Sequence, residues 1–485
     1  MTTRIAAGYL PGLPAESLAW ESRTFRARGQ AIEVALPRPT PEQLILLAAK
    51  VRKAAQENLA VMPVMDVVDA IDRCIARMLD AADPARQEMD RLLSIVTGFD
   101  AEMTRLGINA ILKTFRRPQL LRFLAEDFGD PGLLDDFRPR PKGGWTRAYG
   151  PKLLGHVWAG NVPGLPLWSL VSGLLVKAGS LGKLASDEPL FAGWFARVLA
   201  EVEPRLADTL AIAWWPGGDA QRERTLAQQS EVLTVYGGDA TLAAWRAHAP
   251  VGTRLLEHGH KLSAGLVSAA ALDARQSLIA ARLAATDMLR WDQQGCYSAQ
   301  IFYVERGARV SPREFARQLA GELSARQYQF TRRDLSLEEA QSIAAWRQAV
   351  AMQAARGADV ELLGSSADPW ALAYLESALP LPPSALNRTA CVLAVDSLDD
   401  AAASLSAQAA YLQTVGLMAS PEELFRLAPL LGQAGATRLC ALGSMTMPES
   451  GWHHDGRFSL LDLVRMVDID MSAEQAAQGL ADYRD

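Results

Sequence analysis

Cys296 is the residue whose setting most clearly predicts covalent chemistry. It lies in Gln-Gln-Gly-Cys-Tyr-Ser at residues 293–298, a polar, glycine-containing turn directly before an apolar segment. A lone cysteine is more often a buried structural thiol than a nucleophile. A turn at the edge of a strand, however, can give a substrate access and can supply the dipoles that favour a thiolate. We therefore predict that Cys296 is a nucleophile, whereas Cys74, Cys391 and Cys440 lack such a setting.

A polar turn around Asn161 is a second candidate. The sequence Ala-Gly-Asn-Val-Pro at residues 159–163 places an amide side chain beside a glycine and a proline. Such an amide can donate a hydrogen bond to a developing oxyanion, or it can simply stabilise the turn. Both interpretations stay open from the residues alone.

Histidines are concentrated in two short segments. His258 and His260 alternate in Glu-His-Gly-His-Lys at residues 257–261, and His454 follows another histidine near the end of the chain. A metal site needs further ligands at suitable spacing, and we find none, so we predict no metal centre. His258 and His260 are either proton donors or ordinary turn histidines.

The segments around these residues alternate between strand and helix patterns. We predict a parallel sheet covered by helices on both faces, an α/β arrangement in which ligands bind beyond the carboxyl ends of the strands. The predicted strands are 153–158, 180–184, 210–215 and 232–236, and the predicted helices are 167–177, 189–202, 220–228 and 240–248. The four turns at 159–164, 185–188, 216–219 and 237–239 are therefore candidates for a binding crevice.

The chain divides into five predicted regions. Residues from 40 to about 130 have helical spacing of apolar side chains, and a Pro/Gly-rich stretch follows. The five regions are an N-terminal helical layer (1–135), an oligomerisation arm (136–152), a cofactor-binding parallel-sheet unit (153–256), a catalytic domain with Cys296 (257–442) and a tail returning to the cofactor unit (443–485).

Composition excludes several classes of protein. The 485 residues carry a net charge of -6, with 49% hydrophobic and 21% charged residues, so the chain lacks the basic field that nucleic-acid binding requires. Residues 152–177 are uncharged between two lysines, but two prolines and an asparagine argue against a membrane span. Four scattered cysteines and no visible export signal predict a cytoplasmic protein.

The polar turns together carry a resemblance to a known family. The sequences Gly-His-Val-Trp-Ala-Gly-Asn-Val-Pro (155–163), Glu-His-Gly-His-Lys (257–261), Asp-Gln-Gln-Gly-Cys-Tyr-Ser (292–298) and His-Asp-Gly (454–456) resemble the long-chain acyl-CoA reductases of bacterial bioluminescence, the LuxC family. That family is similar to the aldehyde dehydrogenases, and the resemblance covers about residues 90 to 470. It implies an aldehyde dehydrogenase-like fold with a Rossmann-type cofactor domain and an α/β catalytic domain.

The resemblance also implies a reaction. Cys296 would take the acyl group from an acyl-CoA or acyl-carrier thioester, and the acyl-enzyme would be reduced to an aldehyde by NADPH. Asn161, with the backbone N–H of Cys296, would hold the oxyanion.

Cofactor residues follow by the same comparison. Lys183 and Ser186 match a Lys-x-x-Glu turn that holds the adenosine ribose, and Ser186 in place of glutamate favours NADPH because a carboxylate would repel a 2′-phosphate. Gly217, Gly237 and Gly238 would let the backbone approach the dinucleotide, although tight turns alone also explain them.

Glu257 leaves the direction of the reaction open. It matches the general base of the oxidising dehydrogenases, and such a base would hydrolyse the acyl-enzyme. Aldehyde oxidation with NAD(P) is therefore an alternative function, and a catalytically silent scaffold is another. As partners we expect an acyl-transferring or ligase protein and further copies of this chain in a homo-oligomer.

Overall fold

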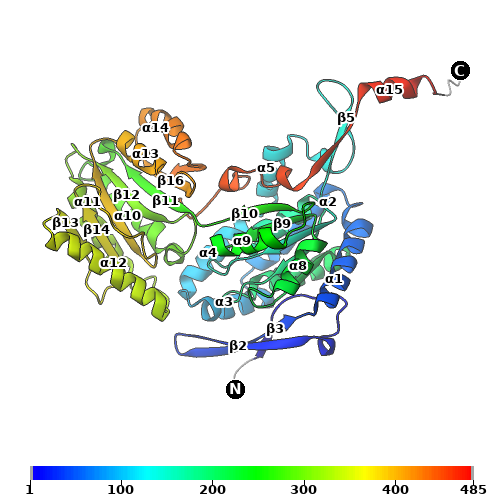
Figure 1. Ribbon diagram of the computed structural model, residues 1–485, viewed down its shortest axis with the longest axis horizontal. Helices are drawn as coiled ribbons and strands as arrows, with labels where there is room; N and C mark the ends of the chain where they lie inside the picture. The colour runs from blue at the N-terminus through cyan, green and yellow to red at the C-terminus, as the bar shows by residue number, and fades with distance from the viewer. Residues whose placement is uncertain (1–3, 482–485) are drawn as a thin grey trace.

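The structure, a computed structural model, describes residues 4–481, which form two lobes and a narrow arm (Figure 1). The first lobe holds the N-terminal strands and helices together with a parallel sheet. The second lobe is built on a larger sheet between residues 262 and 441. The arm leaves the first lobe along β5 (Trp145–Tyr149) and carries the C-terminal helix α15 (Met471–Gln478).

The chain begins with a small sheet instead of helices. Its strands are β1 (Arg4–Ala6), β2 (Ala19–Ala27) and β3 (Gln30–Arg38), in the order β1-β3-β2. Arg28 and Gly29 connect β2 to β3 with φ of 53° and 75°, the left-handed pair of a two-residue hairpin turn. The predicted N-terminal helical layer, 1–135, is therefore wrong for residues 4–38, where β2 and β3 pair antiparallel along their full length.

The helical layer begins at Pro41, where the sequence predicts a helix start. Thr40 caps the first helix with its side chain and forms a reciprocal capping box with Gln43. Apolar residues at helical spacing, among them Leu44, Leu47 and Val51, are fully buried. The layer consists of α1 (Pro41–Ala54), α2 (Val64–Leu79), α3 (Pro84–Thr97), α4 (Ala101–Lys113) and α5 (Arg117–Phe128).

The parallel sheet of the first lobe has five strands in the order β10-β9-β6-β7-β8. The alternation predicted from the sequence is confirmed, and the strand order reverses between β6 and β9. Turns from these two strands therefore meet at the crevice where open α/β sheets bind ligands. The strands are β6 (Leu153–Val157), β7 (Gly179–Lys183), β8 (Leu210–Ala213), β9 (Val232–Tyr236) and β10 (Arg254–His258), and the helices are α6 (Leu165–Leu175), α7 (Phe191–Val202), α8 (Ala220–Gln229) and α9 (Asp239–His248).

The second lobe has seven strands in the order β13-β14-β15-β12-β11-β16-β17. All pairs are parallel except β13 with β14. The strands are β11 (Leu262–Val267), β12 (Ala299–Glu305), β13 (Val360–Leu363), β14 (Ala371–Leu375), β15 (Thr389–Val395), β16 (Leu412–Met418) and β17 (Arg438–Ala441). The helices α10 (Gln276–Leu289) and α11 (Pro312–Arg326) cover one face, and α12 (Leu337–Ala355), α13 (Leu398–Ser406) and α14 (Pro421–Gln433) cover the other.

The C-terminal segment crosses back to the first lobe. Leu460 and Leu463 are buried in the same core as the helices α2 to α5, and Asp127 accepts hydrogen bonds from the backbone of residues 460 and 461. Beyond them β18 (Arg465–Ile469) pairs antiparallel with β5, which in turn pairs with β4 (Arg138–Pro139) to form the sheet of the arm. The final part of the chain thus lies against both the first lobe and the arm.

The uncharged stretch between residues 152 and 177 forms β6, the turn after it and α6. Within the described residues no helix is both long enough and apolar enough to span a membrane.

Helix α4 approaches the segment before Cys296 at a glycine. A Cβ atom placed on Gly107 would lie 2.1 Å from Cζ2 of Trp291, whereas a Cβ on Gly321 in α11 would meet no atom within 4 Å. We expect Gly107→Ala to lower the free energy of unfolding by about 1–3 kcal/mol through overpacking. Gly321→Ala, the control, should raise it by about 0.5–1 kcal/mol because alanine is the better helix former. Urea denaturation measures both changes, and equal effects would contradict the close contact.

Candidate active site

A large cavity lies between the two lobes. Its volume is about 1040 Å³, near the upper end of the roughly 300–1,000 Å³ typical of ligand sites. Asn161 comes to it from the turn after β6, Gly237 and Gly238 from the turn after β9, and Cys296 from the second lobe. The structure therefore brings together the predicted nucleophile, the predicted oxyanion donor and one of the predicted dinucleotide turns.

The turn before Cys296 has an unusual backbone. Trp291, Asp292 and Gln293 have φ of 52°, 48° and 62°, so three successive non-glycine residues are left-handed. Left-handed residues of this kind persist only where their surroundings hold them. A second left-handed run, Leu386 to Arg388, directly precedes β15, which neighbours the strand that follows Cys296.

A buried ion pair joins these two runs. Asp292 Oδ1 lies 2.6 Å from both Nε and Nη2 of Arg388, and neither side chain is exposed. Asp292 Oδ2 also accepts the backbone N–H of Arg333, and Arg388 donates to the carbonyl of Phe330. The ion pair thus holds three segments together: the turn before Cys296, the start of β15 and the loop around Phe330. Phe330 lines the cavity.

The Cys296 thiol is only partly accessible in the cavity wall. Burial, together with the negative charge of Asp455, raises its pKa to about 11. The side-chain amide of Gln413 and the backbone N–H groups of Cys296 and Tyr297 act in the opposite direction through hydrogen bonds. The thiol is therefore protonated at neutral pH, although donors for a thiolate are already in place.

Asn161 is hydrogen-bonded to the turn that carries Cys296. Its Nδ2 donates a 2.6 Å hydrogen bond to the carbonyl oxygen of Gln294, two residues before Cys296. The amide is therefore close to the turn it was predicted to serve, and its donor is engaged by the backbone in this conformation.

Glu257 lies away from the cavity. Its carboxylate forms two hydrogen bonds with Arg246 of α9, at 2.5 and 2.6 Å, and it does not line the cavity wall. Because successive side chains of a strand point to opposite faces, it is the neighbouring His258 that faces the cavity. The structure thus does not bring Glu257 to the cavity wall, and its role as a catalytic base stays a prediction.

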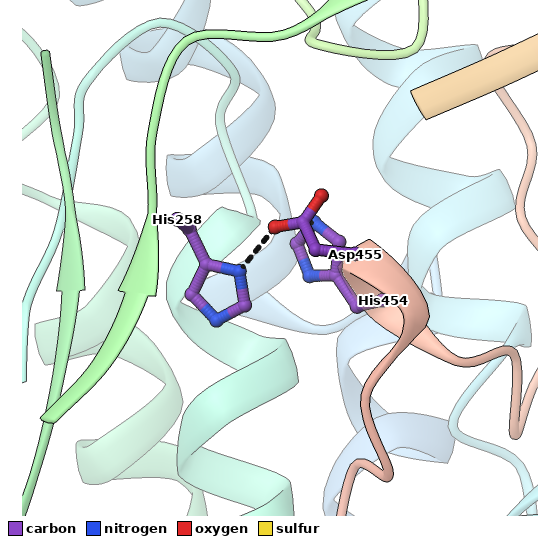
Figure 2. Close-up of side chains that lie close together, drawn as sticks. All are labelled: His258, His454 and Asp455. Carbon is purple, nitrogen blue, oxygen red and sulfur yellow. Dashed lines mark hydrogen bonds and ion pairs between the residues drawn. The ribbon is translucent and has the colours of Figure 1, made fainter. Parts of the chain in front are cut away.

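His258 belongs to a network that sequence spacing does not reveal. Its Nδ1 is 2.7 Å from Oδ2 of Asp455, and the ring stacks on both Tyr236 and His454, with 4.4 Å between centroids in each pair. Figure 2 shows the His258–Asp455 hydrogen bond, with His454 next to the carboxylate. Asp455 Oδ1 accepts a 2.6 Å hydrogen bond from Gln413. The only sequence signal was the His-Asp-Gly motif, whose partners are distant in the chain.

His258, His454 and Asp455 lie close enough together to be considered as a metal site. One ligand atom each from His258, His454 and Asp455 lie within 4.8 Å of one another. The two imidazole planes, however, differ by only 21° and are stacked, so their nitrogen lone pairs lie in nearly parallel planes and do not converge on one ion. Zinc sites also take a fourth ligand. We therefore interpret this group as a histidine–carboxylate hydrogen bond.

The remaining predicted cofactor residues lie along the ends of β7 and β8, outside the cavity. Lys183 is nearly buried, and burial lowers its pKa. Its ammonium group lies 5.8 Å from the ring of Trp215, and the charge of Glu223 partly offsets the effect of burial on the pKa. A cation at the end of a parallel strand is compatible with an anionic ligand.

Ser186 and three glycines, Gly217, Gly237 and Gly238, are the other predicted cofactor residues. Ser186 accepts a hydrogen bond from the Trp214 ring at 3.2 Å. A Cβ on Gly217 would meet no atom within 4 Å, and it is the following Gly218 whose φ of 84° requires glycine. A Cβ on Gly238 would lie 2.7 Å from His260 Nε2. The open space beside Gly217 and the backbone exposed at Gly237 and Gly238 are compatible with a dinucleotide along this edge.

One wall of the cavity is apolar. Helices α4 and α6 contribute Met103, Leu106, Ile111, Leu165 and Trp168. Across from the polar network, these side chains offer a surface for a hydrocarbon chain.

The fold defines the class of protein. The structure resembles aldehyde dehydrogenase 21 of Physcomitrella patens with a TM-score of 0.74 and 13% identity over 97% of this chain and 98% of that one. It resembles the NADP-dependent glyceraldehyde-3-phosphate dehydrogenase of Bacillus halodurans with a TM-score of 0.73 and 13% identity over 96% and 98%. The predicted aldehyde dehydrogenase-like fold is thereby confirmed.

The family follows from the sequence comparison. The acyl-CoA reductase (LuxC) family model matches residues 59–466, and the chain belongs to this family. The long-chain acyl-protein thioester reductases of Photorhabdus laumondii and Aliivibrio fischeri are each 25% identical to it, over 222 and 239 residues. These matches span 45% of this chain and 45% of the first relative, and 48% and 49% for the second, so about half of each relative's length is covered.

The buried ion pair gives a stability prediction. Arg388→Met leaves the Asp292 carboxylate buried without its partner, and we expect a loss of about 3–5 kcal/mol in the free energy of unfolding. The double variant Asp292→Leu/Arg388→Met should recover much of that loss. Arg426→Met, which breaks the exposed pair with Asp399, should change stability by less than about 1 kcal/mol. Similar effects of the two single variants in urea denaturation would contradict the assigned role.

Proposed function

We propose that this protein reduces a fatty acyl thioester to the aldehyde through an acyl-enzyme on Cys296. The observation that supports reduction over aldehyde oxidation is the placement of Glu257. The carboxylate that would activate water for hydrolysis is held by Arg246 outside the cavity, while the thiol lies within it. An acyl group on Cys296 would therefore not have Glu257 beside it as a base for hydrolysis and could persist until it is reduced.

The acylation step exchanges one thioester for another. The Cys296 sulfur attacks the carbonyl carbon, the bond from that carbon to the carrier sulfur breaks, and the carrier leaves as a thiol. Asn161 and the backbone N–H of Cys296 are the proposed donors to the oxyanion. One N–H of the Asn161 amide is bonded to the Gln294 carbonyl, and its second N–H is the proposed donor to the substrate.

Lys183, Ser186, Gly217, Gly237 and Gly238 are the proposed residues for holding NADPH. When bound, NADPH supplies the hydride that converts the acyl carbon to the aldehyde. Lys183 offers a positive charge near the adenosine ribose, and Ser186 leaves room for a 2′-phosphate without introducing a negative charge.

The cavity supports a proposal for the substrate, and the rest of the structure supports proposals for the partner proteins and the compartment. Its apolar wall suits a long acyl chain, carried by CoA or by a carrier protein. An acyl-transferring or ligase protein is the proposed donor, and the projecting arm is the proposed contact between copies in a homo-oligomer. We place this reaction in the cytoplasm, where the four cysteines would remain thiols.

Acyl transfer can be tested without cofactor. After mixing with long-chain acyl-CoA, intact mass should increase by one acyl group, and Cys296→Ala should abolish the increase. Asn161→Ala should slow acylation by about 100- to 1000-fold. Glu257→Gln should leave both the acyl-enzyme's lifetime and NADPH-dependent aldehyde formation within about twofold, because its partner is Arg246. A large loss in Glu257→Gln would instead favour oxidation, and a wild-type protein that is never acylated would favour a silent scaffold.

Cofactor choice can be tested at Ser186. Ser186→Glu should shift the ratio of kcat/KM for NADPH to that for NADH by about tenfold or more toward NADH, because a carboxylate near the 2′-phosphate costs about 1–4 kcal/mol. Ser186→Gln has the same size without the charge and should shift the ratio much less. Equal shifts in the two variants would place the 2′-phosphate away from Ser186.

A further inference from the structure

Asp455 links groups that come from three distant parts of the chain. Oδ2 pairs with His258 at the end of β10, and Oδ1 accepts from Gln413 in β16, whose amide also faces the Cys296 sulfur. Asp455 itself has a left-handed φ of 54° in a short turn of the C-terminal segment. Only 6% of its side chain is exposed. A strained, buried carboxylate of this kind is commonly found at a functional site.

The His258 ring is held in one orientation. Tyr236 and His454 both stack on it, and Trp452 stacks in turn on His454 at 4.7 Å. Nδ1 is committed to Asp455, as Figure 2 shows. Among the described residues Nε2 has no hydrogen-bond partner, and His258 lines the cavity with Cys296. A histidine with one nitrogen fixed by a carboxylate and the other free is suited to carry a proton.

We propose that His258, oriented by Asp455, is the proton carrier for Cys296, accepting the thiol proton and delivering it to the sulfur of the departing carrier. This inference rests on the proposed acyl-thioester reduction. Transfer takes place across the cavity, directly or through one water molecule. As the carbon–sulfur bond to Cys296 forms, the proton moves to Nε2, and as the bond to the carrier breaks, the same proton leaves with the carrier thiol.

The charges around His258 support this direction of transfer. The groups that face it are Asp455, His454 and Tyr236, with Lys261 4.0 Å from Asp455. Burial lowers the pKa of His454 to about 3, so His454 is neutral, and the pKa of the Tyr236 hydroxyl is raised by burial. Burial opposes the charge on Asp455, but its hydrogen bonds with His258 and Gln413 outweigh burial and hold its pKa below the usual range. Asp455 therefore stays ionised and stabilises an imidazolium at His258.

Asp455 and His258 have opposite effects on the thiol. The carboxylate by itself raises the pKa of Cys296 and so disfavours the thiolate. Through His258 it favours transfer of the proton away from sulfur. Removing the Asp455 charge should therefore speed the reaction of the thiol if the carboxylate acts only by its charge, and slow it if the carboxylate acts through His258.

The experiment measures the rate of Cys296 alkylation by iodoacetamide from pH 5 to 10, which needs neither thioester nor NADPH. At pH 7 we expect His258→Gln and Asp455→Asn to slow alkylation by about tenfold or more, and the reaction of His258→Gln should then accelerate only toward the thiol pKa near 11. His453→Gln is the control, because that exposed histidine lies outside the cavity, and its profile should match the wild type. Cys296→Ala gives the background from other thiols.

The inference is overturned if Asp455→Asn is alkylated as fast as the wild type or faster, since the carboxylate would then act only by its charge. An unchanged profile in His258→Gln also overturns it. Imidazole added to His258→Ala should restore at least part of the rate, which a merely structural role would not allow. With acyl-CoA, His258→Gln should slow acylation by about 100-fold. A wild-type protein with the expected alkylation profile but no acylation would contradict the proposed function and leave the proton carrier standing.

Discussion

The buried pair of Asp292 and Arg388 is the interaction on which the geometry of this site depends. Burying two charges is costly, and it is compensated only when geometry and additional hydrogen bonds are favourable. Here the backbone N–H of Arg333 and the carbonyl of Phe330 supply those additional bonds. Both charged residues belong to left-handed backbone runs, so the pair holds two strained turns against each other. Its effect is to fix where the turn before Cys296 can lie.

The C-terminal segment adds the second constraint. Leu460 and Leu463 are anchored in the first lobe, and Asp455 just before them reaches residues of both sheets. The segment therefore couples the orientation of the His258 ring to the relative position of the two lobes. A cavity that lies between lobes needs such a connection, because small displacements of one lobe would separate the nucleophile from its hydrogen-bond partners.

Local patterns allowed part of this structure to be predicted. The alternation of strands and helices between residues 153 and 248 follows from short-range periodicity, and the predicted strands agree with β6 to β9 within about two residues. Cys296 and Asn161 were found because each lies in a polar turn beside a strand. The hairpin of β2 and β3 was missed because Arg28-Gly29 is a weak turn signal without an asparagine or aspartate. Asp455 could not be placed, because its partners His258 and Gln413 are 197 and 42 residues away.

Glu257 shows why sequence alignment alone left the reaction open. Its motif placed a carboxylate near the nucleophile, but on a strand adjacent side chains point to opposite faces, so residues 257 and 258 cannot both enter the cavity. In this chain Arg246 on α9 binds the carboxylate on one face, and Asp455 binds the imidazole on the other. A carboxylate base beside an acyl-enzyme would activate water and lead to the acid. An imidazole that has just received the thiol proton is an acid at the moment the carrier leaves, and it therefore promotes formation of the acyl-enzyme. The register of one strand thus favours the direction in which the thioester is made and then reduced.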